Sequence, residues 1–339
     1  MSVDIAFFGL REPPFNPSPD PRFLHLTPAH QEALAQLLYG VEQHKGFILL
    51  TGEVGTGKTT LLHALLERLD ESTAVAFVTN SMLGFEGILE YVQEDLGISK
   101  PGDSSLAQRL FAFQHFLIER RRSGQNTVLI LDEAQDLEAD TLERIRLLSN
   151  FETTSEKILQ IVLAGQPELR AKLDLPELRQ LKQRIGLRCR IPPLAPEQVR
   201  DYIRTRLRVA GTRDTGLFSP DAVARIAQFS GGIPRLVNTV CDHCLVFAYA
   251  DQVRRIDRRM VDEAIRYLDD GDEPRRPRAT SLARLRGARV SWPVVAASAG
   301  VAGLALLGTA HPDLMWRALD LGASSVSHLA RAARALLPL

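Results

Sequence analysis

The stretch GEVGTGKTT, residues 52–60, constrains this sequence most, because it fits the pattern GxxxxGK[ST] in full. The apolar run GFILLTG leads into it, which indicates a buried strand. A helix with Leu62, Leu65 and Leu66 on one face follows. In this strand–loop–helix setting, glycines allow backbone N–H groups to face phosphate oxygens, and the start of the helix adds its positive dipole end. The sequence therefore predicts a nucleotide-phosphate site.

Each residue of this loop is a candidate nucleotide ligand. The loop residues are Gly52, Glu53, Val54, Gly55, Thr56, Gly57, Lys58, Thr59 and Thr60. We expect Lys58 to neutralise the β- and γ-phosphates and the Thr59 hydroxyl to bind Mg²⁺.

A second stretch, VLILDEAQ over residues 128–135, is an apolar strand that ends in two acids. We expect Asp132 to hold Mg²⁺ through its water shell and Glu133 to act as general base toward the attacking water. A pair of solvated acids at a strand end is the alternative. The phosphate-binding loop at this distance upstream favours the catalytic interpretation.

Apolar strands alternate with amphipathic helices through the first part of the chain, which predicts a parallel sheet covered on both faces. The expected strands lie at residues 46–52, 74–80, 127–132, 158–165 and 187–191. From residue 196 only helical patterns follow, so a small all-helical domain is expected after the sheet. Before the sheet, a proline-rich arm over residues 11–28 leads to a helix capped by Thr27 with Pro28 at its first position.

Composition limits the class of protein without fixing its function. The chain is 45% hydrophobic and 24% charged, and its formal net charge is zero, which is no general signature of nucleic-acid binding. Three cysteines, Cys189, Cys241 and Cys244, form no disulfide framework and suit a reducing compartment. The CxxC pair is expected to pack in a core, because it lies in an apolar, helix-like stretch where free cysteine behaves as a small hydrophobic residue. A zinc site would need two more ligands, and metal or redox chemistry is the alternative. No signal peptide is expected at the N-terminus.

The adjacent Asp–Glu pair, the strand after it and the trailing helical domain resemble the AAA+ ATPases. Within them, the sequence is similar to the general secretion pathway protein A (ExeA-like) family of bacterial ATPases. The segments that carry this resemblance are the proline-rich entry FFGLREPPFNP, the loop at residues 52–60, LDEAQDL, LAGQPEL, LKQRI and GGIPRLVN. The resemblance covers roughly residues 5–268. It implies a five-stranded parallel sheet with a helical lid, and ATP with Mg²⁺ as cofactors.

The resemblance also assigns further roles by position. Gln166 after the fourth strand matches the sensor 1 residue near the γ-phosphate, or alternatively caps the PELRAKL helix. Arg235 in GGIPR matches sensor 2, which reaches from the lid to the phosphates, or is a surface arginine at a helix start. Asn80, at the end of the second strand, is a candidate to orient Glu133.

Arg184 matches the position of an arginine finger, which acts on the ATP of a neighbouring subunit and therefore implies a homo-oligomer. Arg179 and Arg188 are alternatives for this role. The same basic segment, RQLKQRIGLRCR, could bind phosphate backbones. We do not expect a nucleic-acid partner, because finger and interface charges explain the segment and the rest of the chain is not basic.

Near the C-terminus, residues 291–310 carry no charge and are numerous enough to span about 30 Å of hydrocarbon as a helix. Trp292 and Trp316 flank the stretch, and six arginines precede it within residues 275–289. This bias predicts a single span whose N-terminal side is cytoplasmic. An interfacial or soluble alanine-rich helix is the alternative.

The expected organisation follows from these elements. It comprises the arm and first helix at 1–45, the AAA+ domain at 46–193, a helical lid at 194–270, a basic linker at 271–290, a transmembrane helix at 291–311 and a short tail at 312–339. At the position of this tail, members of the family that the sequence resembles often carry a peptidoglycan-binding domain.

We expect an ATPase anchored in the bacterial inner membrane that serves a secretion, pilus or exopolysaccharide export system, with its ATPase domain in the cytoplasm and a partner protein in the inner membrane or periplasm. A DNA-associated AAA+ ATPase of the transposition or initiator type is one alternative. A nucleotide-gated scaffold with negligible turnover is another, and the complete Asp132–Glu133 pair argues against it.

Overall fold

The computed structural model describes residues 4–18, 20–79, 82–98, 104–151, 157–212 and 216–270. Asn80, the basic linker, the predicted membrane span and the tail lie outside these ranges. The described residues all belong to one compact unit of the chain.

Five parallel strands form the sheet in the order β2-β3-β4-β1-β5, which confirms the predicted five-stranded parallel sheet. Their bounds are β1 Phe47–Gly52, β2 Ala74–Val78, β3 Thr127–Leu131, β4 Gln160–Gly165 and β5 Ile185–Ile191. The three central strands are apolar because both of their faces are buried. Successive side chains of β1 face opposite sides, so Leu49 packs in one core cluster and Ile48 in the other.

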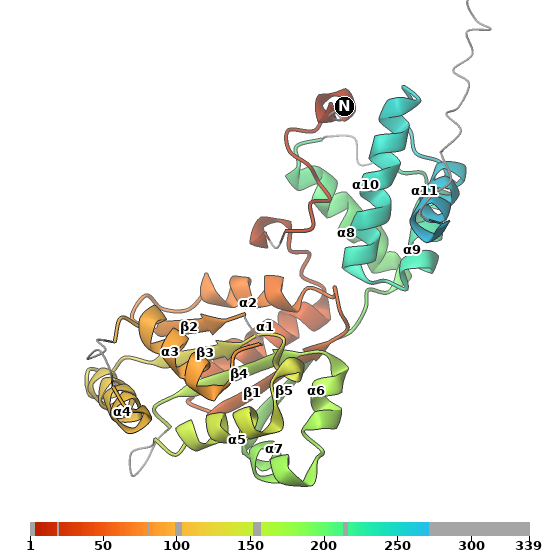
Figure 1. The fold of residues 1–339 in the computed structure, drawn as a ribbon. Helices are drawn as coiled ribbons and strands as arrows, with labels where there is room; N and C mark the ends of the chain where they lie inside the picture. Colours follow the sequence, from red (N-terminus) through yellow and green to blue (C-terminus); the bar gives the residue numbers. More distant parts are fainter. Residues whose placement is uncertain are drawn as a thin grey trace, which may run out of the picture. The chain divides into compact units, whose positions relative to one another are not determined.

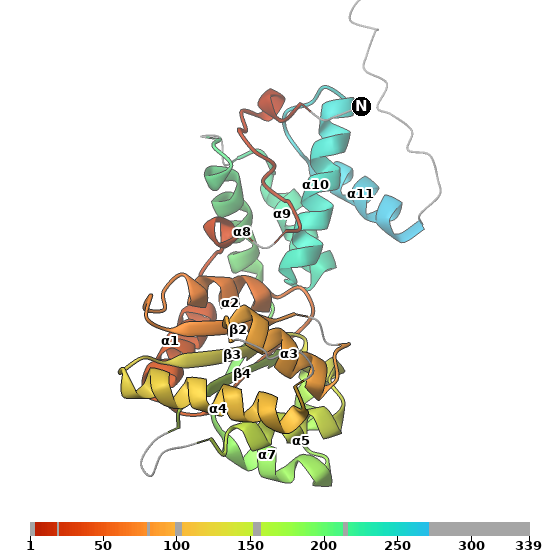
Figure 2. The ribbon, with the colours of Figure 1, turned by 60° about the vertical axis from the view of Figure 1, so that its left-hand side comes forward.

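Helices cover both faces of this sheet (Figures 1 and 2). One face carries α1 (Pro28–Glu42) and α2 (Lys58–Leu66). The other carries α3 (Phe85–Asp95), α4 (Leu106–Arg122), α5 (Ala139–Leu148), α6 (Pro167–Lys172) and α7 (Arg179–Arg184). Short 3₁₀ turns η3 (Ala134–Asp136) and η4 (Pro176–Leu178) lie between them.

The order of the strands in the sheet determines where the predicted nucleotide site lies. Strands β3, β4 and β1 are neighbours and parallel, so their carboxyl ends meet at one edge of the sheet. The loop after β1, the acids after β3 and Gln166 after β4 therefore converge there, although they lie far apart in the sequence.

Within the described residues, four helices follow the sheet as predicted: α8 (Pro196–Val209), α9 (Pro220–Ser230), α10 (Pro234–Ala250) and α11 (Arg258–Asp270). The first three begin with proline, whose fixed φ and missing N–H are tolerated only in the first turn of a helix. The buried faces of these helices form one apolar cluster, which includes Cys241 and Cys244 with no exposed area. Burial raises the pKa of the Cys241 thiol, consistent with the predicted core packing.

The proline-rich arm packs on these lid helices rather than on the sheet. The arm comprises the described residues of 4–27, which include the segment before the prolines. It contains two 3₁₀ turns, η1 (Ile5–Phe8) and η2 (Pro21–Phe23), and no α-helix. Phe8, Leu10, Phe15 and Phe23 are buried in the lid's apolar cluster. The arm runs beside α8 and α10 in both ribbon views (Figures 1 and 2). The chain thus builds the lid core from two segments that flank the sheet domain in the sequence.

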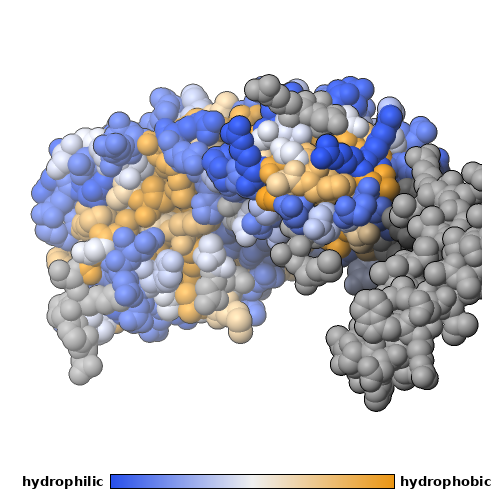
Figure 3. Space-filling view, turned by 90° about the horizontal axis from the view of Figure 1, so that it is seen from above, coloured by the Kyte–Doolittle hydropathy of each residue, from blue (hydrophilic) through white to orange (hydrophobic). Residues whose placement is uncertain are grey.

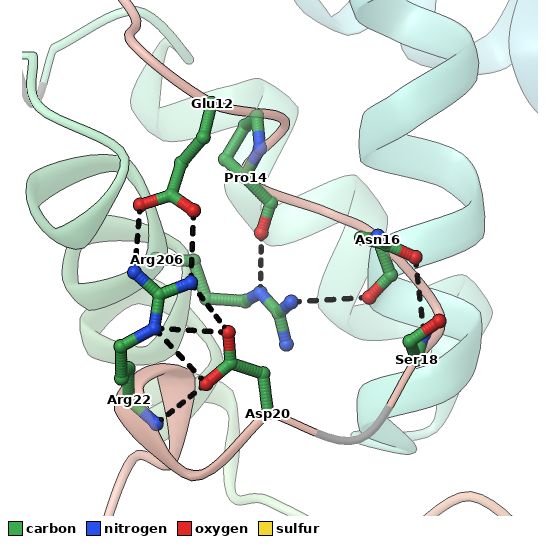
Figure 4. A network of polar contacts seen from close by, with 7 residues as sticks. All are labelled: Glu12, Pro14, Asn16, Ser18, Asp20, Arg22 and Arg206. Carbon is green, nitrogen blue, oxygen red and sulfur yellow. Dashed lines mark hydrogen bonds and ion pairs between the residues drawn. The ribbon is translucent and has the colours of Figure 1, made fainter.

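Arg206 on α8 fixes the arm to the lid (Figure 4). Arg206 is 7% exposed, and its guanidinium donates to the backbone oxygens of Pro14 at 2.5 Å and Asn16 at 3.2 Å. It also donates to the Tyr202 hydroxyl at 2.9 Å and lies 4.7 Å from the centre of the Phe23 ring. A buried cation is stable here because carbonyl dipoles and an aromatic face replace its water.

Replacing Arg206 by alanine is expected to lower the free energy of unfolding by about 3 kcal/mol, because charge-assisted bonds to buried acceptors are lost. Urea unfolding measures this. Hydrogen exchange at the Arg11 N–H, which donates to Ala210 O at 2.7 Å, reports release of the arm. The exposed Arg208 on the same helix is the matched control, and its alanine variant should leave both measurements unchanged. Equal effects of the two variants would contradict a role for Arg206 in holding the arm.

The described surface mixes hydrophilic and apolar areas, as the view from above shows (Figure 3). Exposed large apolar side chains include Phe111 at 70% and Tyr267 at 44%. Within the described ranges, no helix has both the length and the apolar content needed to cross a bilayer. The predicted membrane helix lies outside those ranges and stays a prediction.

Candidate nucleotide-binding site

The loop between β1 and α2 has the backbone that the glycine pattern predicts. Gly57 precedes α2 with φ 98°, a conformation that side-chain-bearing residues rarely adopt. Gly55 has φ 78°, and a Cβ placed on it would lie 2.5 Å from the Cβ of Arg235. Glycine at this position therefore allows the lid helix α10 to begin directly against the loop, where the Arg235 N–H donates to Gly55 O at 3.2 Å.

Lys58 is the first residue of α2 and is 4% exposed. Its ammonium group donates to Gly52 O at 3.0 Å and to Glu53 O at 3.3 Å. The cation is thus folded back over the loop at the end of β1. A phosphate bound by the loop N–H groups would lie beside this charge.

Thr59 and Asp132 meet at the carboxyl ends of β1 and β3. The Thr59 hydroxyl donates to Asp132 Oδ2 at 2.6 Å, and Asp132 Oδ1 accepts from the Glu133 N–H at 2.9 Å. A hydroxyl and a carboxylate are the hard oxygen donors that Mg²⁺ prefers together with phosphate oxygens and water. The pair therefore fits the predicted Mg²⁺ ligands. The described residues hold no cluster of three or more His, Cys, Asp or Glu side chains suited to a metal.

Glu133 stands in a strained backbone conformation, with φ 51° in the left-handed region. Its Oε2 accepts from Gln135 Nε2 at 2.9 Å and from Gln166 Nε2 at 3.5 Å. The structure thus brings the predicted base and the predicted sensor 1 residue together at one edge of the sheet.

The other residues whose roles were assigned from the family resemblance lie in different parts of the structure. Arg235 lines the cavity from the lid side. Arg184 ends α7 and donates to Ser149 Oγ at 2.5 Å, and it is not among the residues that line the cavity. A finger that serves a neighbouring subunit would lie outside its own chain's nucleotide cavity. Asn80 lies outside the described residues, so its role stays a prediction.

A cavity of about 280 Å³ opens over this loop. Its walls come from four parts of the chain: the arm, the loop, the strand end at Glu133, and the lid. The arm and the entry to α1 contribute Asn16, Pro17, Ser18, Asp20, Phe23, Leu24, His25 and His30; the lid side contributes Leu194, Tyr202, Arg206, Pro234, Arg235 and Asn238. The phosphate side of the cavity therefore belongs to the sheet domain, and the opposite wall belongs to the arm and lid.

His30 connects the arm to the phosphate-binding loop, a role that the sequence pattern did not indicate. The residue is 3% exposed, and its ring places Nε2 at 3.3 Å from Thr56 O and Nδ1 at 2.7 Å from Thr27 Oγ1. Because a carbonyl can only accept, Nε2 carries the proton and Nδ1 accepts from the Thr27 hydroxyl. Burial lowers the pKa of His30, so the neutral ring that supports the loop persists to lower pH than for an exposed histidine.

The parallel sheet, the loop after β1, the acids after β3, the polar residue after β4 and the helical lid together define an AAA+ P-loop protein. Residues 41–173 match the family model described as an AAA domain. The chain resembles general secretion pathway protein A of Aeromonas hydrophila, with 43% identity over 244 residues, which cover 72% of this chain and 44% of that relative. The chain thus spans less than half the length of this curated relative.

Two further comparisons agree on the fold. The chain superposes on the ORC2 protein of Aeropyrum pernix in ADPNP and ADP complexes with a TM-score of 0.58 and 18% identity, covering 74% of this chain and 70% of that one. It superposes on Cdc6p of Pyrobaculum aerophilum with a TM-score of 0.57 and 22% identity, covering 75% and 68% of the two chains. At these identities the likeness concerns the fold alone.

Proposed function

We propose that this chain is a membrane-anchored ATPase that couples ATP binding and hydrolysis to the assembly or function of a bacterial secretion, pilus or exopolysaccharide export system. The observation that carries the proposal is the 43% identity to general secretion pathway protein A, which extends well beyond the 133 residues of the AAA match. The contact between Thr59 and Asp132 supports the nucleotide chemistry.

The proposed mechanism assigns one task to each group that lines the cavity or contacts a lining residue. The loop N–H groups and Lys58 bind and orient the phosphates, and Thr59 with Asp132 would hold Mg²⁺, which neutralises charge on the β- and γ-phosphates when bound. Glu133 accepts a proton from the water that attacks the γ-phosphorus. Gln166 orients this water or the γ-phosphate, since its amide lies beside the Glu133 carboxylate.

Two arginines complete the proposed ATPase. Arg235 approaches the phosphates from the lid, since α10 begins against the phosphate-binding loop. Arg184 stabilises transition-state charge on the ATP of a neighbouring copy, so the active form is a homo-oligomer. A partner protein of the export system, in the inner membrane or periplasm, receives the conformational change.

The proposed anchor is the apolar stretch at residues 291–311. The arginines before it favour a cytoplasmic location for the ATPase domain at the bacterial inner membrane. The hydropathy of this stretch is modest, but a single span would hold the protein at the membrane. Its small residues would allow close packing against a helix of a partner protein.

Membrane fractionation of the full-length protein tests the anchor. We expect it to remain in the membrane pellet after washing with 1 M salt, because salt screens surface charge but does not extract a spanning helix. Removal of residues 291–339 should move the protein to the soluble fraction with its ATP turnover retained. Full-length protein that washes off with salt would contradict the anchor, and DNA-stimulated turnover would then favour the DNA-associated alternative.

A further inference from the structure

Gln135 follows the predicted catalytic acids by two residues and is 8% exposed. Its carboxamide uses every hydrogen-bonding group it has. Nε2 donates to Glu133 Oε2 at 2.9 Å and to Asp136 Oδ2 at 3.1 Å, and Oε1 accepts from the Gln166 N–H at 3.0 Å. One side chain thus joins the residue after β3 that would act as base to the residue after β4 that would act as sensor.

The residues around the Gln135 side chain leave space for its amide and hold the turn that carries it. A Cβ placed on Gly165 would lie 2.7 Å from Gln135 Oε1, so glycine at the end of β4 leaves the space that the amide occupies. The Gln135 backbone oxygen accepts from Lys172 Nζ at 2.5 Å, and Leu137 O accepts from the same ammonium group at 2.8 Å. The turn that carries the acids is therefore tied to both ends of α6.

The two side-chain amides bind the same carboxylate oxygen of Glu133. Gln135 and Gln166 both donate to Oε2, and Glu133 itself lines the cavity. The backbone of Glu133 is strained, and such a conformation persists only where its surroundings fix it. The Gln135 amide supplies that restraint on the side chain.

We propose that Gln135 is a positioning residue that fixes the orientation of the Glu133 carboxylate and links it to the start of α6. This inference rests on the proposed hydrolysis and deepens it. Gln135 acts through Glu133, because its amide donates to the Glu133 carboxylate and Glu133 is the residue of this pair that lines the cavity.

The decisive variant is Gln135→Glu, which keeps the shape of the side chain and an acceptor for the Gln166 N–H. It replaces the donor beside Glu133 Oε2 by a carboxylate oxygen. The two carboxylates repel each other, and the hydrogen bond that holds Glu133 Oε2 is lost. We therefore expect the single-turnover rate to fall about tenfold or more. The Kd for ATP should stay within about threefold of the wild type.

A second variant separates this role from simple folding. Gln135→Leu removes the donor and the acceptor together, and we expect the single-turnover rate to fall about tenfold or more. The Kd for ATP, measured with a fluorescent analogue, should stay within about threefold of the wild type, because the loop and Lys58 are untouched. Gln43→Glu makes the same charge change on an exposed residue and should leave the single-turnover rate unchanged.

The experiment uses the full-length protein in detergent with Mg²⁺ and ATP, and single-turnover conditions isolate the chemical step from product release. A Gln135→Glu variant with the wild-type single-turnover rate would overturn the inference, as would a Gln135→Leu variant that loses ATP affinity as much as it loses rate. In both cases a wild type that turns over leaves the proposed function standing. Wild-type protein that binds ATP without turnover overturns the proposed hydrolysis and this inference together.

Discussion

Replacing Lys58 by alanine is expected to abolish nucleotide binding at micromolar concentrations. The ammonium group is buried at the end of β1, and its partners are carbonyl oxygens of the loop. Removing a buried charge that faces a phosphate costs about 2–5 kcal/mol, which corresponds to roughly 30-fold to 5,000-fold in Kd. Equilibrium binding of a fluorescent ATP analogue measures this loss.

Lys45→Ala is the matched control for this experiment. Lys45 is exposed and lies just before β1, at the opposite end of the strand from the loop. Its loss should leave the Kd unchanged. A Lys58→Ala variant that binds nucleotide with wild-type affinity would remove the loop from the nucleotide site.

Replacing Glu133 by glutamine is expected to leave ATP binding intact and to lower turnover by about 10²–10⁴-fold, the usual contribution of a general base. Glutamine has the size of glutamate and can keep contact with the neighbouring amides, but it cannot take a proton from water. Phosphate release under saturating ATP measures turnover, and the binding assay used for Lys58 measures affinity.

Glu138→Gln provides the comparison for Glu133. Glu138 is exposed, lies five residues further along the chain and makes no side-chain capping bond to α5. Its variant should turn over at the wild-type rate. Substantial residual hydrolysis in Glu133→Gln would contradict the assignment of Glu133 as the general base. Another group near the cavity would then have to accept the proton.

The strands and the phosphate-binding loop could be predicted from sequence because their determinants are local. A continuous apolar run such as Phe47–Gly52 is only stable when both faces are covered, so it indicates a parallel sheet by itself. The glycine spacing of the loop likewise follows from the backbone angles that phosphate binding requires. These features need no knowledge of distant residues.

The helix α3 is absent from the elements predicted above, although its signal is present. Phe85, Ile88, Leu89 and Val92 have helical spacing, and all four are buried against the sheet. The segment begins with a glycine cap rather than with a Ser, Thr, Asp or Asn, so the usual start signal is missing.

The contacts made by the arm, His30 and Gln135 could not be predicted, because each depends on residues brought together only by the fold. The arm has no periodic apolar pattern, and the prolines at positions 13–21 indicate only that it is not helical. Gln135 follows a recognisable acidic pair, yet its importance comes from Gln166, thirty-one residues away. Long-range partners of this kind leave no mark in a local pattern.

The lid core is built from two segments that are far apart in the sequence, and this affects how the chain folds as it is synthesised. The arm is translated first, but Arg206, which binds Pro14 O, follows 192 residues later. At typical translation rates of about 5–20 residues per second, the apolar arm waits roughly 10–40 s before its binding surface exists. The sheet domain can assemble during that interval, whereas the lid requires closure of a very long loop and therefore folds last. Until then Phe8, Leu10, Phe15 and Phe23 form an exposed apolar segment that chaperones could bind.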